Sequence, residues 1–258
     1  MDFLTQYGLF LLEALTLAAV VVLLVRALRP ADSFSSAGSG SLSVTRLDRY
    51  FERLTRSLDD VTQAPKALKK ARKARKKALK AGDDATRPRI FVLTFKGDIR
   101  ASQSHALRQE ISAVIGAHRE GDSVLLRLES PGGSVTGYGL AASQLARLRQ
   151  AQIPLVVAVD QVAASGGYMM ACVADEIIAA PFAIVGSIGV VSTIPNVNRA
   201  LKAAKIDVEL LTAGEFKRTL TVLGENTEEG RVKAQEQLEE IHEHFKQFVV
   251  RYRPDLDI

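Results

Sequence analysis

Three short passages of the sequence carry residue types that a hydrolytic site needs: Ser130–Ser134 (SPGGS), Ala163–Gly167 (AASGG) and Gly214–Lys217 (GEFK). Each passage follows an apolar run with the composition of a strand. In a parallel α/β sheet the carboxyl ends of the strands lie along one edge, so loops that follow different strands can meet there. The order of these runs therefore predicts that the three passages converge on one cleft.

Ser165 is the candidate nucleophile. It lies between a strand-like run and the small residues Gly166 and Gly167, so its hydroxyl would project from a tight strand-to-helix turn, as in a nucleophile elbow. The same context suits a serine that caps a helix by accepting hydrogen bonds from backbone N–H groups. The local pattern leaves both interpretations open.

Gly132, Gly133 and Gly166 are candidate oxyanion and substrate-binding residues. Backbone N–H groups at such positions can stabilise a tetrahedral oxyanion, at roughly 2.7–4 kcal/mol per donor in the transition state. A turn that requires positive φ explains the glycines of residues 132 and 133 equally well. Their role is therefore open at this point.

A serine nucleophile needs a base, and Lys217 is the best candidate in the sequence. A buried lysine can lose its proton near neutral pH, and Lys217 lies in a stretch with few charges. The four histidines fall on or beside helical segments and are expected to be solvated surface residues: His105, His118, His242 and His244. Because these residues and the single cysteine form no recognisable ligand cluster, neither a metal nor another cofactor is expected.

Apolar periodicity places these loops in an α/β domain over residues 89–258. Strand-like runs occur at 90–95, 123–130, 153–160 and 207–212, and helical spacing occurs at 102–117, 136–150 and 227–250. Prolines and glycines interrupt the apolar stretch 177–194, so we interpret it as buried strands and turns rather than as a membrane span. The alternation predicts a largely parallel sheet covered by helices.

Residues 1–28 are predicted to form a transmembrane anchor. Residues 8–25 are apolar apart from Glu13 and nearly cross a hydrocarbon core of about 30 Å as a helix. A cleaved signal peptide would have a basic start, a shorter apolar run and a small-residue cleavage motif, which this sequence lacks. Arg26 and Arg29 follow the apolar run, so the positive-inside tendency places the C-terminal bulk in the cytoplasm.

Residues 29–88 are expected to link the anchor to the folded domain. A flexible Ser/Gly-rich stretch, 31–43, precedes a row of apolar residues on one helical face: Leu47, Tyr50, Phe51, Leu54, Leu58 and Val61. Nine Lys and Arg residues and no acid follow between 64 and 80, so the basic excess of the chain, formally +5, lies here. This run is either a solvated helical spacer or a site that binds anionic lipid headgroups. A nucleic-acid arm is disfavoured because the run has no interleaved aromatic residues.

Four runs of the sequence are similar to the signal peptide peptidase A family of Ser/Lys peptidases, and most closely to its SohB branch of bacterial inner-membrane proteases. They are ESPGGSVTGYGLAASQL, VAASGGYMMACVAD, APFAIVGSIGVV and TAGEFKRTLTVLGENTEEGR, in this order within residues 89–254. The resemblance implies a Clp protease/crotonase-like fold, with Ser165 as nucleophile and Lys217 as general base. It also implies that Ser187 orients the lysine amine and that residues 131–134 pair with the substrate backbone.

The resemblance further implies how the protein assembles and where it acts. Such proteases form homo-oligomeric rings or domes in which the serine and the lysine of one site come from neighbouring subunits. They act at the periplasmic face of the inner membrane, opposite to the side that the charge asymmetry indicates. They continue through another helix and strand, so the present sequence is expected to be truncated at its C-terminus. Residues 220–225 lack a proline that is common in the wider family, which favours the SohB branch.

The expected function is therefore a membrane-anchored serine endopeptidase that hydrolyses polypeptides, such as signal-peptide remnants, through an acyl-enzyme on Ser165. Two alternatives share the fold: an inactive scaffold, and a crotonase-like enzyme that polarises an acyl-CoA thioester. Neither alternative requires both Ser165 and Lys217, so their presence within matching motifs favours the peptidase.

Overall fold

A parallel sheet forms the centre of the chain in the computed structural model, which describes residues 8, 16, 42–80, 87–214 and 217–258. Its strand order is β1-β2-β3-β5, with bounds Ile90–Lys96, Ser123–Glu129, Leu155–Val159 and Glu176–Ala179. A second parallel pair joins β4 (Val162–Ala164) to β6 (Ile184–Gly186). Alternation of buried and less buried side chains along β2 and β3 explains why these runs form strands with one face in the core.

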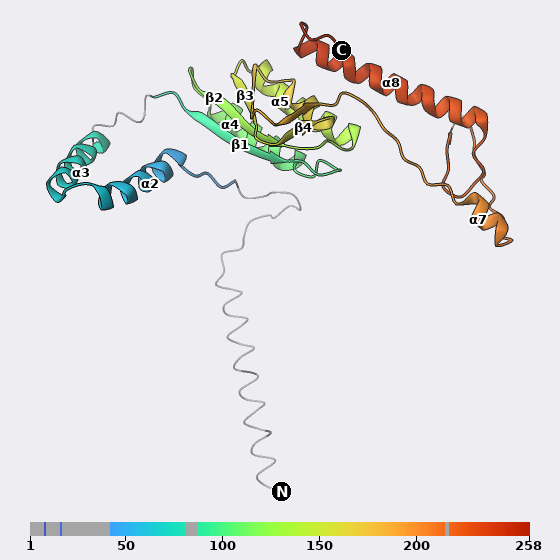
Figure 1. Cartoon of the computed structure of the whole chain (residues 1–258), viewed down its shortest axis with the longest axis horizontal. Coiled ribbons are helices and arrows are strands. Elements are labelled where there is room, and N and C mark those ends of the chain that lie inside the picture. The colour runs from blue at the N-terminus through green and yellow to red at the C-terminus, as the bar shows by residue number, and fades with distance from the viewer. Residues whose placement is uncertain (1–7, 9–15, 17–41, 81–86, 215–216) are drawn as a thin grey trace. The chain divides into compact units, whose positions relative to one another are not determined.

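Two helices, α4 (Ser104–Ala117) and α5 (Val135–Gln150), pack against each other beside the sheet (Figure 1). Their buried apolar side chains meet those of β2 and β3 in a core that includes Leu107, Ile111, Leu126, Leu145 and Val157. The short helix α6 (Gly166–Ala171) is buried along its whole length and packs against α5. This core fixes the ends of β2 and β4, from which the candidate loops emerge.

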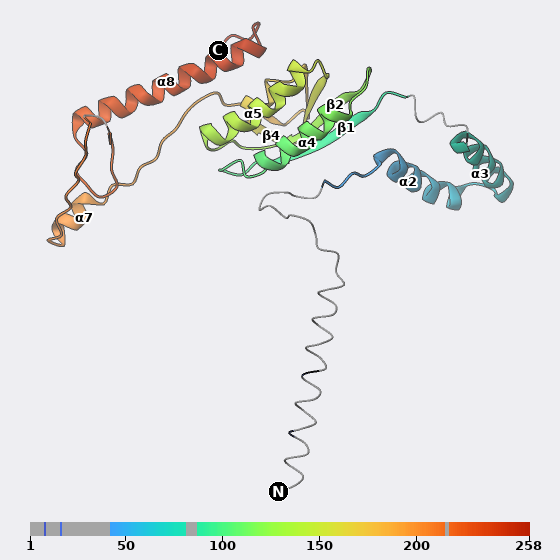
Figure 2. The same cartoon turned by 180° about the vertical axis from the view of Figure 1, so that it is seen from behind.

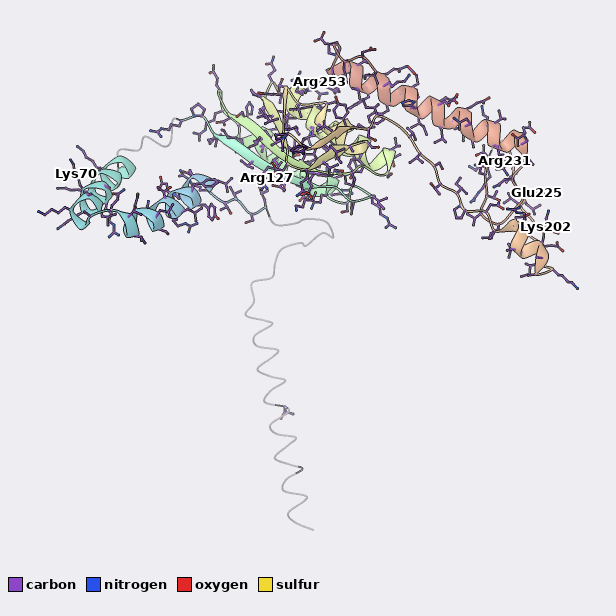
Figure 3. The ribbon with its side chains drawn as sticks, in the orientation of Figure 1. Lys70, Arg127, Lys202, Glu225, Arg231 and Arg253 are labelled. Carbon is purple, nitrogen blue, oxygen red and sulfur yellow. The ribbon has the colours of Figure 1, made fainter. Side chains whose placement is uncertain are left out.

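The C-terminal helix α8 (Glu228–Tyr252) reaches this core through its last turns. Phe245 and Val249 are buried, and Arg253 donates from Nη2 to the carbonyl of Ala174 at 2.8 Å (Figure 3). The described residues between β6 and α8 contain one short helix, α7 (Asn198–Ala203), and an ion pair joins Lys202 to Glu225 at 2.7 Å. Figure 2 shows the same elements from behind.

Two further helices precede the sheet in the sequence: α2 (Leu47–Thr62) and α3 (Pro65–Lys80). The helical interpretation of the apolar row and of the basic run is therefore confirmed. No residue of α2 is buried. Contacts between Cα atoms group Val44–Ile258 in one unit and Met1–Ser43 in another.

The sequence predicted most of these elements, and the parallel α/β architecture is confirmed. The strand predicted at 207–212 is wrong: this segment has no strand partner among the described residues, and Leu211 is 91% exposed. Residues 177–194 contain strands and turns as expected, but the prediction that they are buried is wrong. Phe182 and Val191 are 98% and 86% exposed, because no other described element of the chain covers them.

The predicted membrane anchor falls almost wholly outside the described residues. Within the parts of the chain that the structure describes, no helix is both long enough and apolar enough to cross a membrane.

Candidate active site

Ser165 stands at a strained strand-to-helix turn. Strand β4 ends at Ala164 and α6 begins at Gly166, and Ser165 between them has φ 51° and ψ −118°. A residue other than glycine in such a region costs of the order of 1–3 kcal/mol, so the surrounding packing must hold it there. The side chain of Ser165 makes no capping hydrogen bond to α6. The interpretation of Ser165 as a helix cap is therefore wrong, and its half-buried hydroxyl is available for chemistry.

The loop after β2 approaches Ser165 closely at Gly132. Gly132 has φ +93°, and a Cβ atom there would lie 2.7 Å from the Cβ of Ser165 and 2.8 Å from the nitrogen of Gly166. Both distances are too short for a side chain, so only glycine lets the two loops meet. A Cβ at Gly166 would in turn lie 2.4 Å from the ring of Tyr138. Steric requirements therefore account for these glycines whatever further role they have.

The hydroxyl groups of Ser130 and Tyr138 form a buried hydrogen-bonded pair that holds the Gly132 loop. The Ser130 hydroxyl donates to the Tyr138 hydroxyl at 2.7 Å, which donates to the Asp98 carbonyl at 2.8 Å. The N–H of Gly132 donates to Ser130 Oγ at 3.1 Å. Burial is the main cause that raises the pKa of Tyr138 above its usual value, so its phenol stays protonated and keeps its donor role.

The backbone N–H groups beside Ser165 differ in whether they are free to donate a hydrogen bond to a substrate. The Gly132 N–H is already bonded to Ser130, whereas the N–H groups of Gly133 and Gly166 have no acceptor among the described residues. Gly166 is the first residue of α6, where N–H groups have no partner within the helix. The two free donors are those that an incoming carbonyl oxygen could use.

Pairing of β4 with β6 brings Ser187 next to the Ser165 turn. Ala164 is the register partner of Gly186, and the N–H of Ser165 donates to the Gly186 carbonyl at 2.8 Å. Ser187 follows with φ 57° and is exposed. Both serines thus leave adjacent strands in strained conformations, at the same end of the pair.

The structure does not join Lys217 to these residues. Lys217 is exposed, and no hydrogen bond or ion pair connects its side chain to Ser165 or Ser187. Its backbone N–H donates to Gly214 at 3.3 Å. Because the predicted strand at 207–212 is absent, the third passage does not follow a strand of the sheet. Two of the three passages converge within the chain, together with the Ser187 turn, and the third does not.

His242 on α8 is a neighbour of the site that sequence reasoning missed. Its Nε2 lies 3.1 Å from the carbonyl oxygen of Ile188, the residue after Ser187. A carbonyl only accepts, so Nε2 must carry the proton. The expectation that all four histidines are solvated is wrong for His242, which is half-buried. No local signal could reveal this contact, since it spans 54 residues and depends on how α8 docks.

The parallel sheet and the serine presented at a strand-to-helix turn define an α/β protein with a site of the serine-hydrolase kind. Comparison with known proteins agrees with this class. The models of Peptidase family S49 N-terminal and Peptidase family S49 match residues 2–145 and 147–257, so the chain belongs to peptidase family S49. The family is one of proteases, and the chain is accordingly a serine-type protease.

Curated relatives narrow the assignment to the SohB type. The probable protease SohB of Haemophilus influenzae is 52% identical over 100% of this chain and 77% of the relative. The probable protease SohB of Buchnera aphidicola subsp. Schlechtendalia chinensis is 45% identical over 100% of this chain and 89% of the relative. The sequence-based recognition of a SohB-type peptidase is confirmed.

Among solved structures, the 1510-N membrane-bound stomatin-specific protease in complex with a substrate peptide is similar to part of the chain. The two are 22% identical with a TM-score of 0.35, over 43% of this chain and 48% of that one.

Proposed function

We propose that the chain is a Ser/Lys-dyad endopeptidase with a Clp protease/crotonase-like fold, in which Ser165 is the nucleophile and Lys217 the general base. The observation that carries this proposal is the strained Ser165 turn, whose hydroxyl does not cap α6 although it stands at the cap position. Strain held by packing at a residue with a free nucleophilic group is typical of active sites. Membership of a protease family supplies the reaction class.

The reaction proceeds in two balanced halves. Lys217 takes the hydroxyl proton while Ser165 Oγ attacks the peptide carbonyl, and the lysine then passes that proton to the leaving amine as the C–N bond breaks. A water molecule next gives a proton to Lys217 and attacks the acyl-enzyme, and Ser165 recovers its proton as the acid product leaves. Ser187 orients the lysine amine in this scheme, consistent with its place beside Ser165.

Gly133 and Gly166 supply the oxyanion donors in this proposal. Their N–H groups have no acceptor in the described part of the chain, whereas that of Gly132 donates to Ser130 at 3.1 Å. Gly132 therefore contributes by allowing close approach, and residues 131–134 bind the substrate backbone. Each oxyanion donor is worth roughly 2.7–4 kcal/mol in the transition state.

Lys217 of each site comes from a neighbouring subunit of a homo-oligomer in this account. Two observations support the proposal. Lys217 is exposed and unbonded to Ser165 in its own chain, and large apolar side chains around it and after β5 are uncovered, including Phe182, Val191 and Leu211 at 98%, 86% and 91% exposure. Exposed apolar surface of this kind marks association sites.

We also propose a division of the chain into an anchor at 1–28, a linker and basic spacer at 29–88, and the peptidase domain at 89–258. The apolar run 8–25 would hold the protein in the bacterial inner membrane in a single pass, and the basic helix α3 would lie against anionic lipid headgroups. The substrates would be extended polypeptides at that membrane, such as signal-peptide remnants. Retention of the full chain in membranes after carbonate washing tests the anchor, and its release would contradict it.

Mixing two inactive variants tests the shared site. Ser165→Ala and Lys217→Ala chains are prepared separately, each without activity on an unfolded protein substrate, and then mixed under conditions in which differently labelled subunits exchange. Some interfaces of the mixture pair an intact Ser165 with an intact Lys217, so part of the activity should return. Lack of rescue despite measured exchange would place both residues in one subunit.

A Lys217→Arg chain provides the matched control for the base. Arginine keeps the positive charge but cannot give up its proton in this pH range. The Arg variant should therefore be inactive alone, but because its Ser165 is intact it should restore activity when mixed with Ser165→Ala, to the same extent as Lys217→Ala does. An active Arg variant would remove Lys217 as the base.

A further inference from the structure

We propose that α2 is a dimerisation element, which pairs in parallel with α2 of a second copy of this chain as a short two-stranded coiled coil. This surface lies outside the peptidase domain. The inference does not depend on the catalytic proposal.

The apolar face of α2 has the spacing of a coiled-coil seam. Apart from Tyr50, which lies at the edge of the stripe, its apolar residues follow one another at steps of four, three, four and three: Leu47, Phe51, Leu54, Leu58 and Val61. The mean step of 3.5 residues is the repeat that keeps one narrow stripe facing a partner helix. Residues at the seam are uncovered, with Phe51, Leu58 and Val61 at 60%, 70% and 86% exposure. No side chain of α2 is buried, so the chain's own described elements leave the seam open.

The two borders of this seam carry opposite charge. On the border next to Phe51 and Leu58 lie Asp48, Glu52 and Asp59, and on the border next to Tyr50 lies Arg53. Arg46, just before the helix, is ion-paired with Asp48 of its own chain. Asp60 on the second border is paired with Arg72 of α3 at 2.9 Å, which offsets its charge.

This asymmetry selects the partner's direction. When two copies pair in parallel about a two-fold axis, the acidic border of each helix faces the basic border of the other. In an antiparallel pair the two acidic borders would face each other, and so would the two basic borders, and like charges repel. Within one copy Arg56 bonds Glu52 at 2.9 Å and Arg46 bonds Asp48, but such exposed pairs are weak and can exchange for pairs across the interface.

A lipid surface fits α2 less well than a second copy does. Helices that lie in the membrane interface carry Lys and Arg on their polar face, next to anionic headgroups. Here four acids outnumber the three arginines of α2, and Asp48, Glu52 and Asp59 lie along one edge of the apolar stripe, so anionic headgroups would repel that edge. The basic helix α3 has the opposite character, with no acid in its sequence. The charge pattern therefore separates a protein-pairing helix from a lipid-binding one.

The length of α2 limits how strongly it pairs. Sixteen residues contain little more than two heptads, and the repeat continues into α3 at Pro65, Leu68 and Arg72, where proline and arginine end the seam. Isolated helices of this length are marginal in water. Pairing therefore requires that the copies already be held close together, which raises their effective concentration.

Disulfide trapping on the full-length chain tests the seam. The chain carries one cysteine, Cys172, which is fully buried, so unmodified protein is the background control. We expect Leu54→Cys to form a covalent dimer at least tenfold faster than Arg56→Cys, which lies two residues away on the opposite face. Mere proximity of the copies would link both variants alike. Equal rates would therefore overturn the proposal.

Two further experiments on full-length variants determine the relative direction of the paired helices and the identity of what covers the seam. Leu47→Cys and Val61→Cys chains should each link to themselves in parallel pairs, whereas an antiparallel pair would link one to the other. Quenching of a fluorophore on the Leu54→Cys chain by brominated lipid, without cross-linking, would show a membrane in place of the second copy. Either of the latter results overturns the proposal.

Charge exchange across the borders gives an independent readout. A chain with Asp48→Arg, Glu52→Arg and Asp59→Arg has two basic borders, and one with Arg53→Glu has two acidic borders. In the Leu54→Cys background we expect each alone to cross-link severalfold more slowly than its parent, and the mixture to form the mixed dimer at a rate close to the parent's. If either charge variant alone cross-linked as fast as its parent, the opposite charges of the borders would not select the parallel pair.

Discussion

The backbone N–H of Ser165 donates to the carbonyl of Gly186 at 2.8 Å, which fixes the nucleophile turn to the turn that carries Ser187. This bond continues the β4–β6 ladder by one residue beyond the Ala164–Gly186 pair. Any movement of the second turn is therefore transmitted to the backbone of Ser165. The geometry of the nucleophile depends on a contact between strands whose paired residues, such as Ala164 and Gly186, are 22 positions apart in the sequence.

Replacement of Gly132 should damage activity more than stability. Gly132→Ala puts a Cβ 2.7 Å from the Cβ of Ser165 at a backbone with φ +93°, so the two loops must move apart. A displacement of about 1 Å at reacting groups costs roughly 10²-fold in rate, whereas a strained residue costs of the order of 1–3 kcal/mol in stability. Peptidase turnover and urea unfolding measure the two effects.

Gly139→Ala is the matched control for this prediction. Gly139 lies within α5, and nothing lies within 4 Å of a Cβ at that position. Alanine in a helix is favoured over glycine by roughly 0.5–1 kcal/mol, so this variant should keep its activity and unfold at equal or higher urea. Full turnover by Gly132→Ala would show that the two loops need not meet.

His242 should act as a positioning residue for the Ser187 turn. His242→Ala removes the donor to the Ile188 carbonyl, which lies 3.1 Å from Nε2, and should lower kcat severalfold with little change in KM. Loss of one such bond costs about 0.5–1.5 kcal/mol in stability. His242→Gln retains an N–H donor and should recover part of kcat. His244→Ala, an exposed change on the same helix, serves as control, and an equal effect of both Ala variants would refute the role.

The strands at the centre of the sheet could be predicted from the sequence because their partners belong to the same chain. The runs that became β1, β2 and β3 alternate in burial or are wholly apolar, and each pairs with its neighbour. The run at 207–212 has the same composition, yet it forms no strand, since hydrogen-bonding partners decide the outcome and periodicity cannot reveal them.

The candidate site was predictable to the extent that its loops follow strands. Glycines around Ser165 pointed to close approach, and the structure gives the reason in the 2.7 Å that separates a Gly132 Cβ from Ser165. Whether Ser165 capped α6 could not be decided from local sequence, because cap and elbow place serine at the same position. His242 could not be found either, because its contact depends on the docking of α8.

Protonation of Asp122 should lower the folding stability of the protein at acidic pH. The Arg89 guanidinium, at 2.6 Å, and the N–H groups of Arg89 and Arg119, at 2.7 Å and 2.8 Å, hold the pKa of Asp122 well below its ordinary value of 3.8. The folded state thus favours the carboxylate, so its stabilisation is complete above about pH 4–5 and is lost as pH falls toward the lowered pKa.

The Asp122→Asn variant measures this contribution. At pH 7 it should unfold at lower urea, by about 1–3 kcal/mol, because amide hydrogen bonds replace charged ones. The difference from the unmodified chain should shrink below about pH 4, since the unmodified carboxyl also loses its charge there. Asp160→Asn, an exposed change, should leave the curve unchanged. A difference that stayed constant down to pH 2 would contradict the assignment.

Labelling with a serine-directed fluorophosphonate, followed by mass mapping of the modified residue, tests the central claim most directly. The full-length protein, extracted with detergent, should carry the phosphonyl group on Ser165 alone, and labelling should be lost in Ser165→Ala with the unfolding curve preserved. Lys217→Ala should be labelled at least tenfold more slowly, because the hydroxyl then lacks its base. Labelling of another serine, or an undiminished rate without Lys217, would contradict a Ser165–Lys217 peptidase.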